Sequence, residues 1–371
     1  MFNRRLAHHI DWLLILLVSL IVLMGIASVS SATYSMTSGE RLSALAIRQL
    51  VWAGAGTVAM LVFLLIDYRK FERYGYLFYV AVLTLLVLVP AIGYLGGGSR
   101  RWIHLGFFTL QPSEPAKLAL IIVLARFFHR DVGRESYRLR DLLWPAALFA
   151  VPAALILSQP DLGTAVVLGF IFASMVLVAG IRVRSLAYLI VAALIGISAA
   201  GQVIWGHLKP YQQKRIVTFF NPEADPLGAG YHIIQSKIAV GSGKVWGKGY
   251  RQGTQNQLRF LPEQHTDFIF SVFAEEWGLV CCLLLLLLYF AVIWRGLQVV
   301  SRAKDRFGAL LAFGVVATIF WQVFVNISMT TGVLPVVGIT LPFFSYGGSS
   351  MITLLAGVGL LVNVSMRRFT F

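Results

Sequence analysis

The chain has 371 residues, of which 58% are hydrophobic and only 13% are charged, and its mean hydropathy is +0.78. This composition excludes an ordinary soluble globular domain and is typical of polytopic membrane proteins. The net charge of +15 does not indicate a nucleic-acid-binding protein, because the basic residues lie in short clusters between apolar runs, as membrane topology requires.

Apolar segments of about 17–25 residues can each cross a bilayer as a helix, and the sequence contains ten of them. We predict spans at residues 11–31, 48–67, 73–93, 113–129, 143–158, 162–180, 186–204, 267–294, 307–329 and 346–366. No small-residue cleavage site follows the first segment, so we expect it to be retained. No internal repeat or low-complexity linker divides the chain, which predicts one all-α polytopic membrane domain over residues 1–371.

The positions of lysine and arginine predict the orientation of the spans. Arginines gather in alternate connections, at residues 1–10, 68–72, 130–142, 181–185, 295–306 and 367–371. Cytoplasmic loops carry such an excess of basic residues. Both termini are therefore predicted to be cytoplasmic.

One connection on the opposite, outer side is much longer than the others. Residues 205–266 separate the seventh and eighth predicted spans and contain eight basic residues against three acidic ones. Such a loop suits an anionic substrate or lipid phosphates. Within it, the clustered apolar residues of segment 231–238 are typical of an amphipathic segment that lies on lipid head groups. Residues 241–249 are rich in glycine but lack the spacing of a P-loop, so a glycine-rich turn is predicted.

Asp267 stands at the start of the eighth predicted span, where a polar interval gives way to residues 268–294. The only charges in that run are Glu275 and Glu276. A carboxylate at the boundary with lipid costs several kcal/mol unless it is paired or lines a wet cavity, so Asp267 is a candidate site residue. The alternative is that Asp267 caps the helix and interacts with its dipole.

Further polar residues lie at the outer ends of other predicted spans. Ser113 is predicted to be an N-cap, and Glu114 and Lys117 are three residues apart, so they share a helix face and suit an ion pair. Asp161 lies in the tight turn between the fifth and sixth spans, where an aspartate is commonly a cap. The ninth loop ends in residues 341–350 (LPFFSYGGSS), whose glycines suit close helix packing.

With the orientation above, a set of polar residues falls on the outer side. Its members are Arg101, Glu114, Lys117, Asp161, Asp267, Ser345 and Ser349. A carboxylate base, a cation and a basic loop at the lipid boundary suit group transfer from a lipid pyrophosphate. No residues show the spacing of a metal site, and the adjacent Cys281 and Cys282 are expected to be buried thiols.

Four motifs together resemble one membrane-protein family. They are residues 111–117 (QPSEPAK), 159–164 (QPDLGT), 261–270 (LPEQHTDFIF) with the acidic pair at 275–276, and 344–350 (FSYGGSS). Their order and combination resemble the SEDS family, and residues 253–258 and 334–338 resemble its RodA, elongation-type branch rather than the FtsW branch. Thr340 departs from the proline expected in many members.

The resemblance implies a ten-span fold in the bacterial cytoplasmic membrane and peptidoglycan glycosyltransferase activity on lipid II, with the active site on the extracytoplasmic side. It implies a class B penicillin-binding protein as partner within the elongation machinery. Asp267 matches the family's essential acidic residue and would be the general base, and Lys117 or Arg101 would lie near the donor pyrophosphate. Glu114 and Asp161 match other polar cavity positions. Displacement of the pyrophosphate would invert the anomeric centre and give a β-1,4 link.

Two other classes of function remain as alternatives. A flippase that carries lipid II without chemistry also needs intramembrane charges, and a non-catalytic scaffold for the transpeptidase would explain the topology. The outer-sided polar set and the lack of an internal repeat favour the enzyme. No cofactor is assigned from the sequence, and a divalent cation bound with the pyrophosphate is left open.

Overall fold

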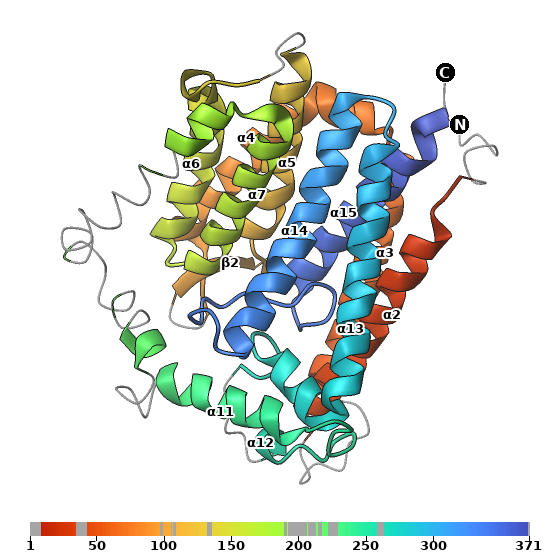
Figure 1. Ribbon diagram of the computed structural model, residues 1–371, viewed down its shortest axis with the longest axis vertical. Helices are drawn as coiled ribbons and strands as arrows, with labels where there is room; N and C mark the ends of the chain where they lie inside the picture. Colours follow the sequence, from red (N-terminus) through yellow and green to blue (C-terminus); the bar gives the residue numbers. More distant parts are fainter. Residues whose placement is uncertain are drawn as a thin grey trace.

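The computed structural model describes residues 9–34, 43–96, 99–104, 106, 109–131, 136–188, 191, 206, 213, 217–221, 229–257 and 263–369. Long helices run side by side along the long axis of the molecule (Figure 1). Their bounds are α2 Trp12–Ala32, α3 Ala44–Leu65, α4 Tyr68–Ile92, α5 Ser113–Arg130, α6 Leu143–Ser158, α7 Leu162–Gly180, α13 Ile269–Ser301, α14 Arg306–Thr330 and α15 Gly348–Met366. The shorter helices are η1 Leu139–Leu142, α11 Ala229–Ser242, α12 Thr254–Gln257 and η3 Arg367–Phe369.

In the described part of the chain, eight helices are long and apolar enough to cross a membrane. Helix α5 is the predicted fourth span, but it is not one of these eight helices. It carries four charged residues, Glu114, Lys117, Arg126 and Arg130, and is therefore less apolar than they are. The predicted seventh span, residues 186–204, lies mostly outside the described residues. The polytopic helical fold is confirmed, whereas the number of ten spans stays a prediction.

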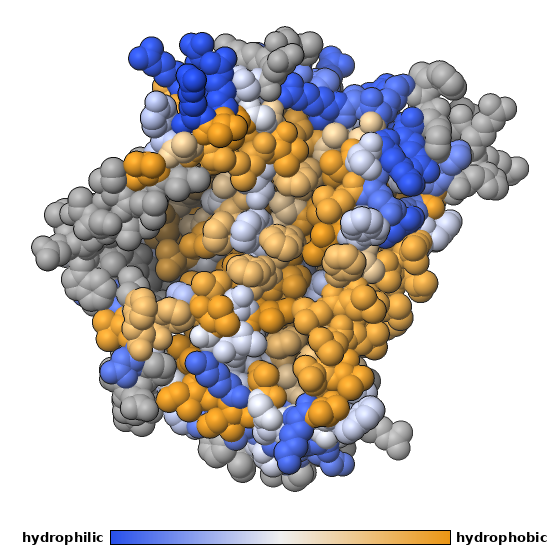
Figure 2. All heavy atoms as spheres, in the orientation of Figure 1, coloured by the Kyte–Doolittle hydropathy of each residue, from blue (hydrophilic) through white to orange (hydrophobic). Residues whose placement is uncertain are grey.

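The periphery of the helix bundle carries apolar side chains that suit contact with lipid. Figure 2 shows hydrophobic side chains across the middle of the visible face and hydrophilic ones toward both ends. On α13, Leu287, Phe290 and Trp294 are each more than half exposed. Helices can present such side chains to lipid because all their backbone hydrogen bonds are made within the helix. In contrast, almost every residue of α15 is buried, so this helix lies in the centre of the bundle.

The predicted cytoplasmic connections gather at one end of the bundle. Four ion pairs or hydrogen bonds join them: Asp11 to Arg295, Asp67 to Arg367, Glu72 to Arg130, and Asp305 to Tyr68. These contacts place both ends of the described chain, at residues 9 and 369, on the same side. Helix α11 lies across the opposite end (Figure 1).

A small antiparallel sheet interrupts the helical pattern between α4 and α5. Its strands are β1 Tyr94–Gly96, β2 Ser99–His104 and β3 Thr109–Leu110, in the order β1-β2-β3. The sequence did not predict these strands. Backbone N–H and C=O groups that leave a helix need other partners, and here they find them across the antiparallel pairs β1–β2 and β2–β3.

Helix α11 contains the predicted amphipathic piece at residues 231–238. Ile233, Ser236 and Ala239 are buried, and Ser236 Oγ donates to Thr330 O at 2.6 Å. The helix is thus confirmed, but its buried face packs on α13 and α14 rather than only on head groups. Its opposite side keeps Ile238 exposed.

The glycine-rich segment at 241–249 packs its backbone against a break in α13. Gly278, inside α13, has a φ of +71° and a ψ of −175°, so the helix is two helices joined at a kink. Lys244 O accepts from Leu279 N at 2.9 Å, and Gly249 N donates to Glu276 O at 2.9 Å. A Cβ at Gly247 would lie 2.2 Å from Glu276 O. The glycines therefore serve a close backbone contact, in agreement with the turn predicted from sequence.

Candidate functional site

Asp267 lies in the turn that precedes α13, at the α11 end of the bundle. The helix begins at Ile269, and its N-cap position is Phe268 rather than Asp267. The main chain of Asp267 is fixed on both sides. Its N–H donates to Glu263 O at 3.1 Å, and Asn326 Nδ2 donates to its carbonyl at 3.0 Å. The half-buried side chain is thereby held at the mouth of the helix without being its cap.

Gly338 determines what lies beside the Asp267 carboxylate. Its φ of +74° is in the left-handed region that favours glycine, and a Cβ there would lie 3.2 Å from Asp267 Oδ2. Asn326 Nδ2 also donates to Ile339 O at 2.7 Å. One buried amide from α14 therefore holds both the turn of Asp267 and the turn of Gly338, which keeps the carboxylate against the backbone.

Gly338 also lines a small cavity of about 50 Å³. The polar residues that share this lining are Gln111, Glu114, Lys117, Thr164, Gln322 and Thr340. Lys117 Nζ and Glu114 Oε2 are 2.8 Å apart, and their side chains are only 2% and 8% exposed. The predicted ion pair is confirmed. A cavity of this volume holds a water molecule but no sugar ring. In this conformation Lys117 and Glu114 therefore have each other as charged partners and no substrate between them.

Asp161 is the N-cap of α7, which agrees with the prediction that an aspartate in this turn caps the helix. Its Oδ1 accepts from Thr164 N at 3.2 Å. Its Oδ2 accepts from Thr164 Oγ1 at 2.9 Å, Gln111 Nε2 at 3.1 Å and Ser113 Oγ at 3.3 Å. With four donors around a buried carboxylate, Asp161 joins α7 to the start of α5 and is poorly placed to act as a base.

Ser113 differs from its prediction as an N-cap. The N-cap position of α5 is Pro112, which makes no side-chain hydrogen bond, and Ser113 is the first helical residue. Its hydroxyl donates to Asp161 instead. A partner 48 positions away outcompetes the local cap, because that partner is a buried carboxylate and hydrogen bonds to charged groups are the stronger ones.

Arg101 extends from β2 to the turn that precedes α7. Its Nε donates to Gln159 O at 2.9 Å, and its Nη2 donates to Pro160 O. The guanidinium thus orders the backbone next to Asp161. Contact with a pyrophosphate would require it to release these carbonyls.

Ser345 and Ser349 join separate segments around the site. Ser345 Oγ donates to Thr266 O at 2.7 Å and accepts from Leu341 N at 2.8 Å. It therefore ties the ninth loop to the residue before Asp267. Ser349 Oγ donates to Thr109 O and accepts from Gln111 N, both at 3.0 Å. Both serines are buried, and their hydroxyls hold neighbouring segments of the site together through these hydrogen bonds.

His265 lies two residues before Asp267 and outside the helices. Burial lowers the pKa of His265, and the nearby Glu263 carboxylate opposes this effect. Its ring lies 5.7 Å from that of Tyr346. The lowered pKa favours a neutral imidazole at pH 7, so His265 is an alternative proton acceptor in the same turn.

Two residues that build this site, Gln322 and Asn326, were not predicted from the sequence, and Glu275 was predicted only as part of a motif. Gln322 and Asn326 are buried on α14, and their signal was present as two amides in a predicted membrane span. Glu275 is fully buried, and its Oε1 lies 2.6 Å from Lys248 Nζ and accepts from Gln255 N at 3.2 Å. This carboxylate anchors residues 248–255 on α13. Within the described ranges, no group of His, Cys, Asp and Glu forms a metal cluster.

Comparisons with known sequences cover nearly the whole chain. The profile described as cell cycle protein, of the FtsW, RodA and SpoVE type, matches residues 9–369. Peptidoglycan glycosyltransferase MrdB of Escherichia coli (strain K12) is 42% identical over 94% of this chain and 93% of that protein. Peptidoglycan glycosyltransferase RodA of Treponema pallidum (strain Nichols) is 32% identical over 96% of this chain and 98% of that protein.

Solved structures agree with the sequence comparisons. A chain from a structure described as coordinating polymerization and crosslinking in a peptidoglycan synthase complex has a TM-score of 0.82 and 34% identity, covering 98% of this chain and 99% of that chain. The rod shape determining protein RodA of Thermus thermophilus has a TM-score of 0.71 and 31% identity, covering 98% of both chains. Both similarities extend over the helices and the site described above.

Proposed function

The chain belongs to the FtsW, RodA and SpoVE family of cell cycle proteins, and we propose on that premise that it is an elongation-type peptidoglycan glycosyltransferase that polymerises lipid II. The similarity to MrdB and RodA over almost the full length supports the reaction class, and the similarity to a rod shape determining protein supports the role in cell shape.

The observation that carries the mechanism is the setting of Asp267. Its carboxylate is half-buried, its backbone is held by Asn326, and it packs on Gly338 beside the cavity of Lys117. We assign Asp267 as the general base. It takes the proton from the acceptor sugar hydroxyl while that oxygen bonds to the anomeric carbon of the donor. The bond from that carbon to the pyrophosphate breaks, and its electron pair leaves with the pyrophosphate.

Lys117 is the cation we assign to the leaving pyrophosphate. It is already buried and fixed by Glu114 at 2.8 Å, so its charge acts in a poorly solvated place where electrostatic stabilisation is strong. Arg101 is the weaker candidate, because its guanidinium binds the carbonyls of Gln159 and Pro160. Binding of the donor would open the cavity and give Lys117 a second anionic partner.

A class B penicillin-binding protein is the proposed partner. The similarity to a chain in a peptidoglycan synthase complex that coordinates polymerization and crosslinking supports this assignment. A polymerase and a transpeptidase act on the same glycan strand, so their association keeps product and second substrate together.

Polymerisation by the purified protein tests the proposed function directly. We expect lipid II to be converted into glycan strands by the protein with its class B partner, and less efficiently by the protein alone. The product is detected on gels after labelling. If the protein moves lipid II across proteoliposome membranes but forms no glycan with the partner present, the flippase alternative holds. If it does neither and only binds the transpeptidase, the protein is a scaffold.

The orientation is a second part of the proposal, with both termini in the cytoplasm of the bacterial inner membrane and Asp267 on the extracytoplasmic side. Cysteine placed at Val245, which is 48% exposed, is expected to react with an impermeant thiol reagent added to spheroplasts. Cysteine placed at Val183, which is 81% exposed, should react only after lysis. Both variants require a background without Cys281 and Cys282. The opposite labelling pattern would place the site in the cytoplasm.

A further inference from the structure

At the end of the bundle opposite Asp267, a cavity of about 240 Å³ opens between α2, α13 and the end of α15. Its charged lining residues are Asp11 before α2, Arg295 and Arg302 on α13, and Arg368 on η3. Gln298 and Ser365 add uncharged polar groups. We call this the inner arginine cavity. It shares no residue with the catalytic proposal.

The floor of the inner arginine cavity is locked by one ion pair. Arg295 Nη2 donates to both carboxylate oxygens of Asp11, at 3.0 and 2.9 Å, and its Nη1 donates to Gln298 Oε1 at 2.9 Å. Asp11 Oδ1 also accepts from Leu14 N as the cap of α2. The only acid among the described lining residues is therefore engaged, and Arg295 is held in a fixed orientation.

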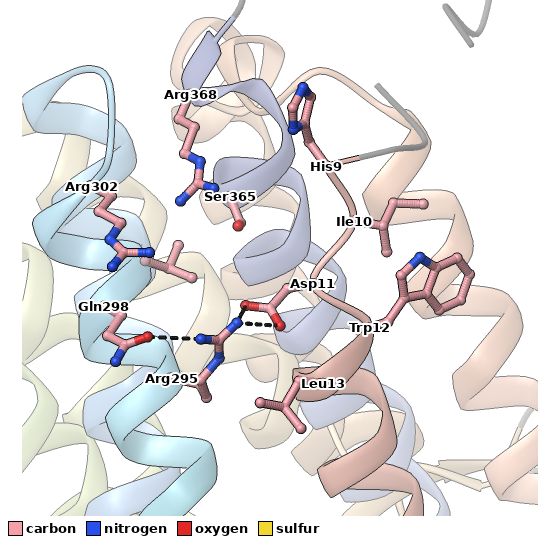
Figure 3. Close-up of a pocket in the computed structure, with 11 residues that line it drawn as sticks. His9, Ile10, Asp11, Trp12, Leu13, Arg295, Gln298, Arg302, Ser365 and Arg368 are labelled. Carbon is pink, nitrogen blue, oxygen red and sulfur yellow. Dashed lines mark hydrogen bonds and ion pairs between the residues drawn. The ribbon is translucent and has the colours of Figure 1, made fainter. Parts of the chain in front are cut away.

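Two further guanidinium groups extend into the space above this pair. Figure 3 shows Arg302, at the end of the helix that also carries Arg295, and Arg368, on η3, extending toward the Asp11–Arg295 pair. The C-terminal ends of α13 and α15 add only partial negative charge, so positive charge remains in excess. The preference for basic residues in cytoplasmic loops explains why arginines occur here, but not why they converge on one cavity with a glutamine and a serine.

The rim of the inner arginine cavity has the residue types that suit the level of lipid head groups. Trp12 and Leu13 line it and are 66% and 47% exposed at the start of α2. A tryptophan at the end of a membrane helix marks the interface between hydrocarbon and water. Basic pockets between helices on the cytoplasmic side suit anionic head groups, and the arginine fork matches phosphate geometry.

We propose that the inner arginine cavity binds the phosphate of an anionic phospholipid from the inner leaflet. The head group would contact Arg302 and Arg368, and the acyl chains would lie along Trp12 and Leu13. Arg295 would be the fixed base of the site. This proposal rests on the orientation proposed above but not on the glycosyltransferase chemistry.

Binding of short-chain phosphatidylglycerol to the full chain in zwitterionic detergent, measured by native mass spectrometry, tests this proposal. We expect tighter binding than for short-chain phosphatidylcholine. A basic residue near an anionic lipid contributes roughly a fivefold change in affinity, so Arg302→Gln should weaken binding about fivefold. Arg302→Gln combined with Arg368→Gln should weaken it about 25-fold if the two effects add.

The matched control removes two arginines elsewhere on the same face. Arg140 and Arg184 are exposed and do not line the cavity, so Arg140→Gln combined with Arg184→Gln should bind like the wild type. Equal weakening in both double variants would overturn the site in favour of general surface charge. Equal affinity for the two lipids would overturn it too.

Competition with inorganic phosphate distinguishes a phospholipid head group from a free phosphate ion as the ligand of the cavity. If phosphate alone displaces phosphatidylglycerol at equal concentration, and does so only when Arg302 is present, the ligand is a free anion and the lipid assignment is wrong. Arg302 is exposed at the helix end, so Arg302→Gln is expected to melt like the wild type. The single variant therefore carries the test if the double variant does not fold. None of these measurements needs turnover, so failure here leaves the polymerisation result intact.

Discussion

Asp267→Asn is expected to lower the rate of lipid II polymerisation by about 10²–10⁴-fold, because a general base contributes a factor of that order. Asparagine keeps the size of the side chain and removes its charge and its basicity. Since Phe268, not Asp267, occupies the cap position of α13, the substitution should leave the helix intact. The variant should insert, purify with its transpeptidase partner and bind lipid II, and the rate is measured from the labelled glycan formed.

The matched control is Glu263→Gln, which neutralises an exposed carboxylate in the same turn. Its rate should stay close to that of the wild type. Near-normal polymerisation by Asp267→Asn would exclude Asp267 as the base. His265 would then be the next candidate, because burial favours its neutral form. Asp161 would follow it with less support, since four donors surround its carboxylate.

Lys117→Met is expected to destabilise the protein by roughly 3–5 kcal/mol, because it leaves the Glu114 carboxylate buried without its cation. The Lys117 and Glu114 side chains are only 2% and 8% exposed, and their charged atoms are 2.8 Å apart. Thermal unfolding in detergent or nanodiscs measures the loss. The control on the same helix is Arg130→Met. Arg130 is 59% exposed and 3.6 Å from Glu72, and exposed pairs contribute about 0–1 kcal/mol.

A second substitution separates the structural role of Lys117 from its proposed role in catalysis. Lys117→Met combined with Glu114→Gln removes both charges, so much of the stability should return. If Lys117 stabilises the leaving pyrophosphate, this double variant folds and still fails to polymerise lipid II. Recovery of both stability and turnover would show that the pair is structural only.

The sequence by itself determined the membrane class, most of the long helices and the Glu114–Lys117 pair. Transfer of apolar side chains from water to hydrocarbon depends on local composition, so a run such as residues 307–329 identifies α14 without knowledge of its neighbours. Glu114 and Lys117 were predictable as a pair for a similar reason, since a helix fixes the geometry of residues three apart.

The tertiary structure alone decided how distant polar groups share their hydrogen bonds. Ser113 bonds to Asp161 rather than capping its own helix. Gly338 approaches Asp267, and Glu275 is surrounded by groups from residues 248–255. A buried carboxylate takes whichever donors the folded chain brings to it, because leaving it unpaired costs more than losing a local cap. Those donors are distant in sequence, so no local pattern encodes them.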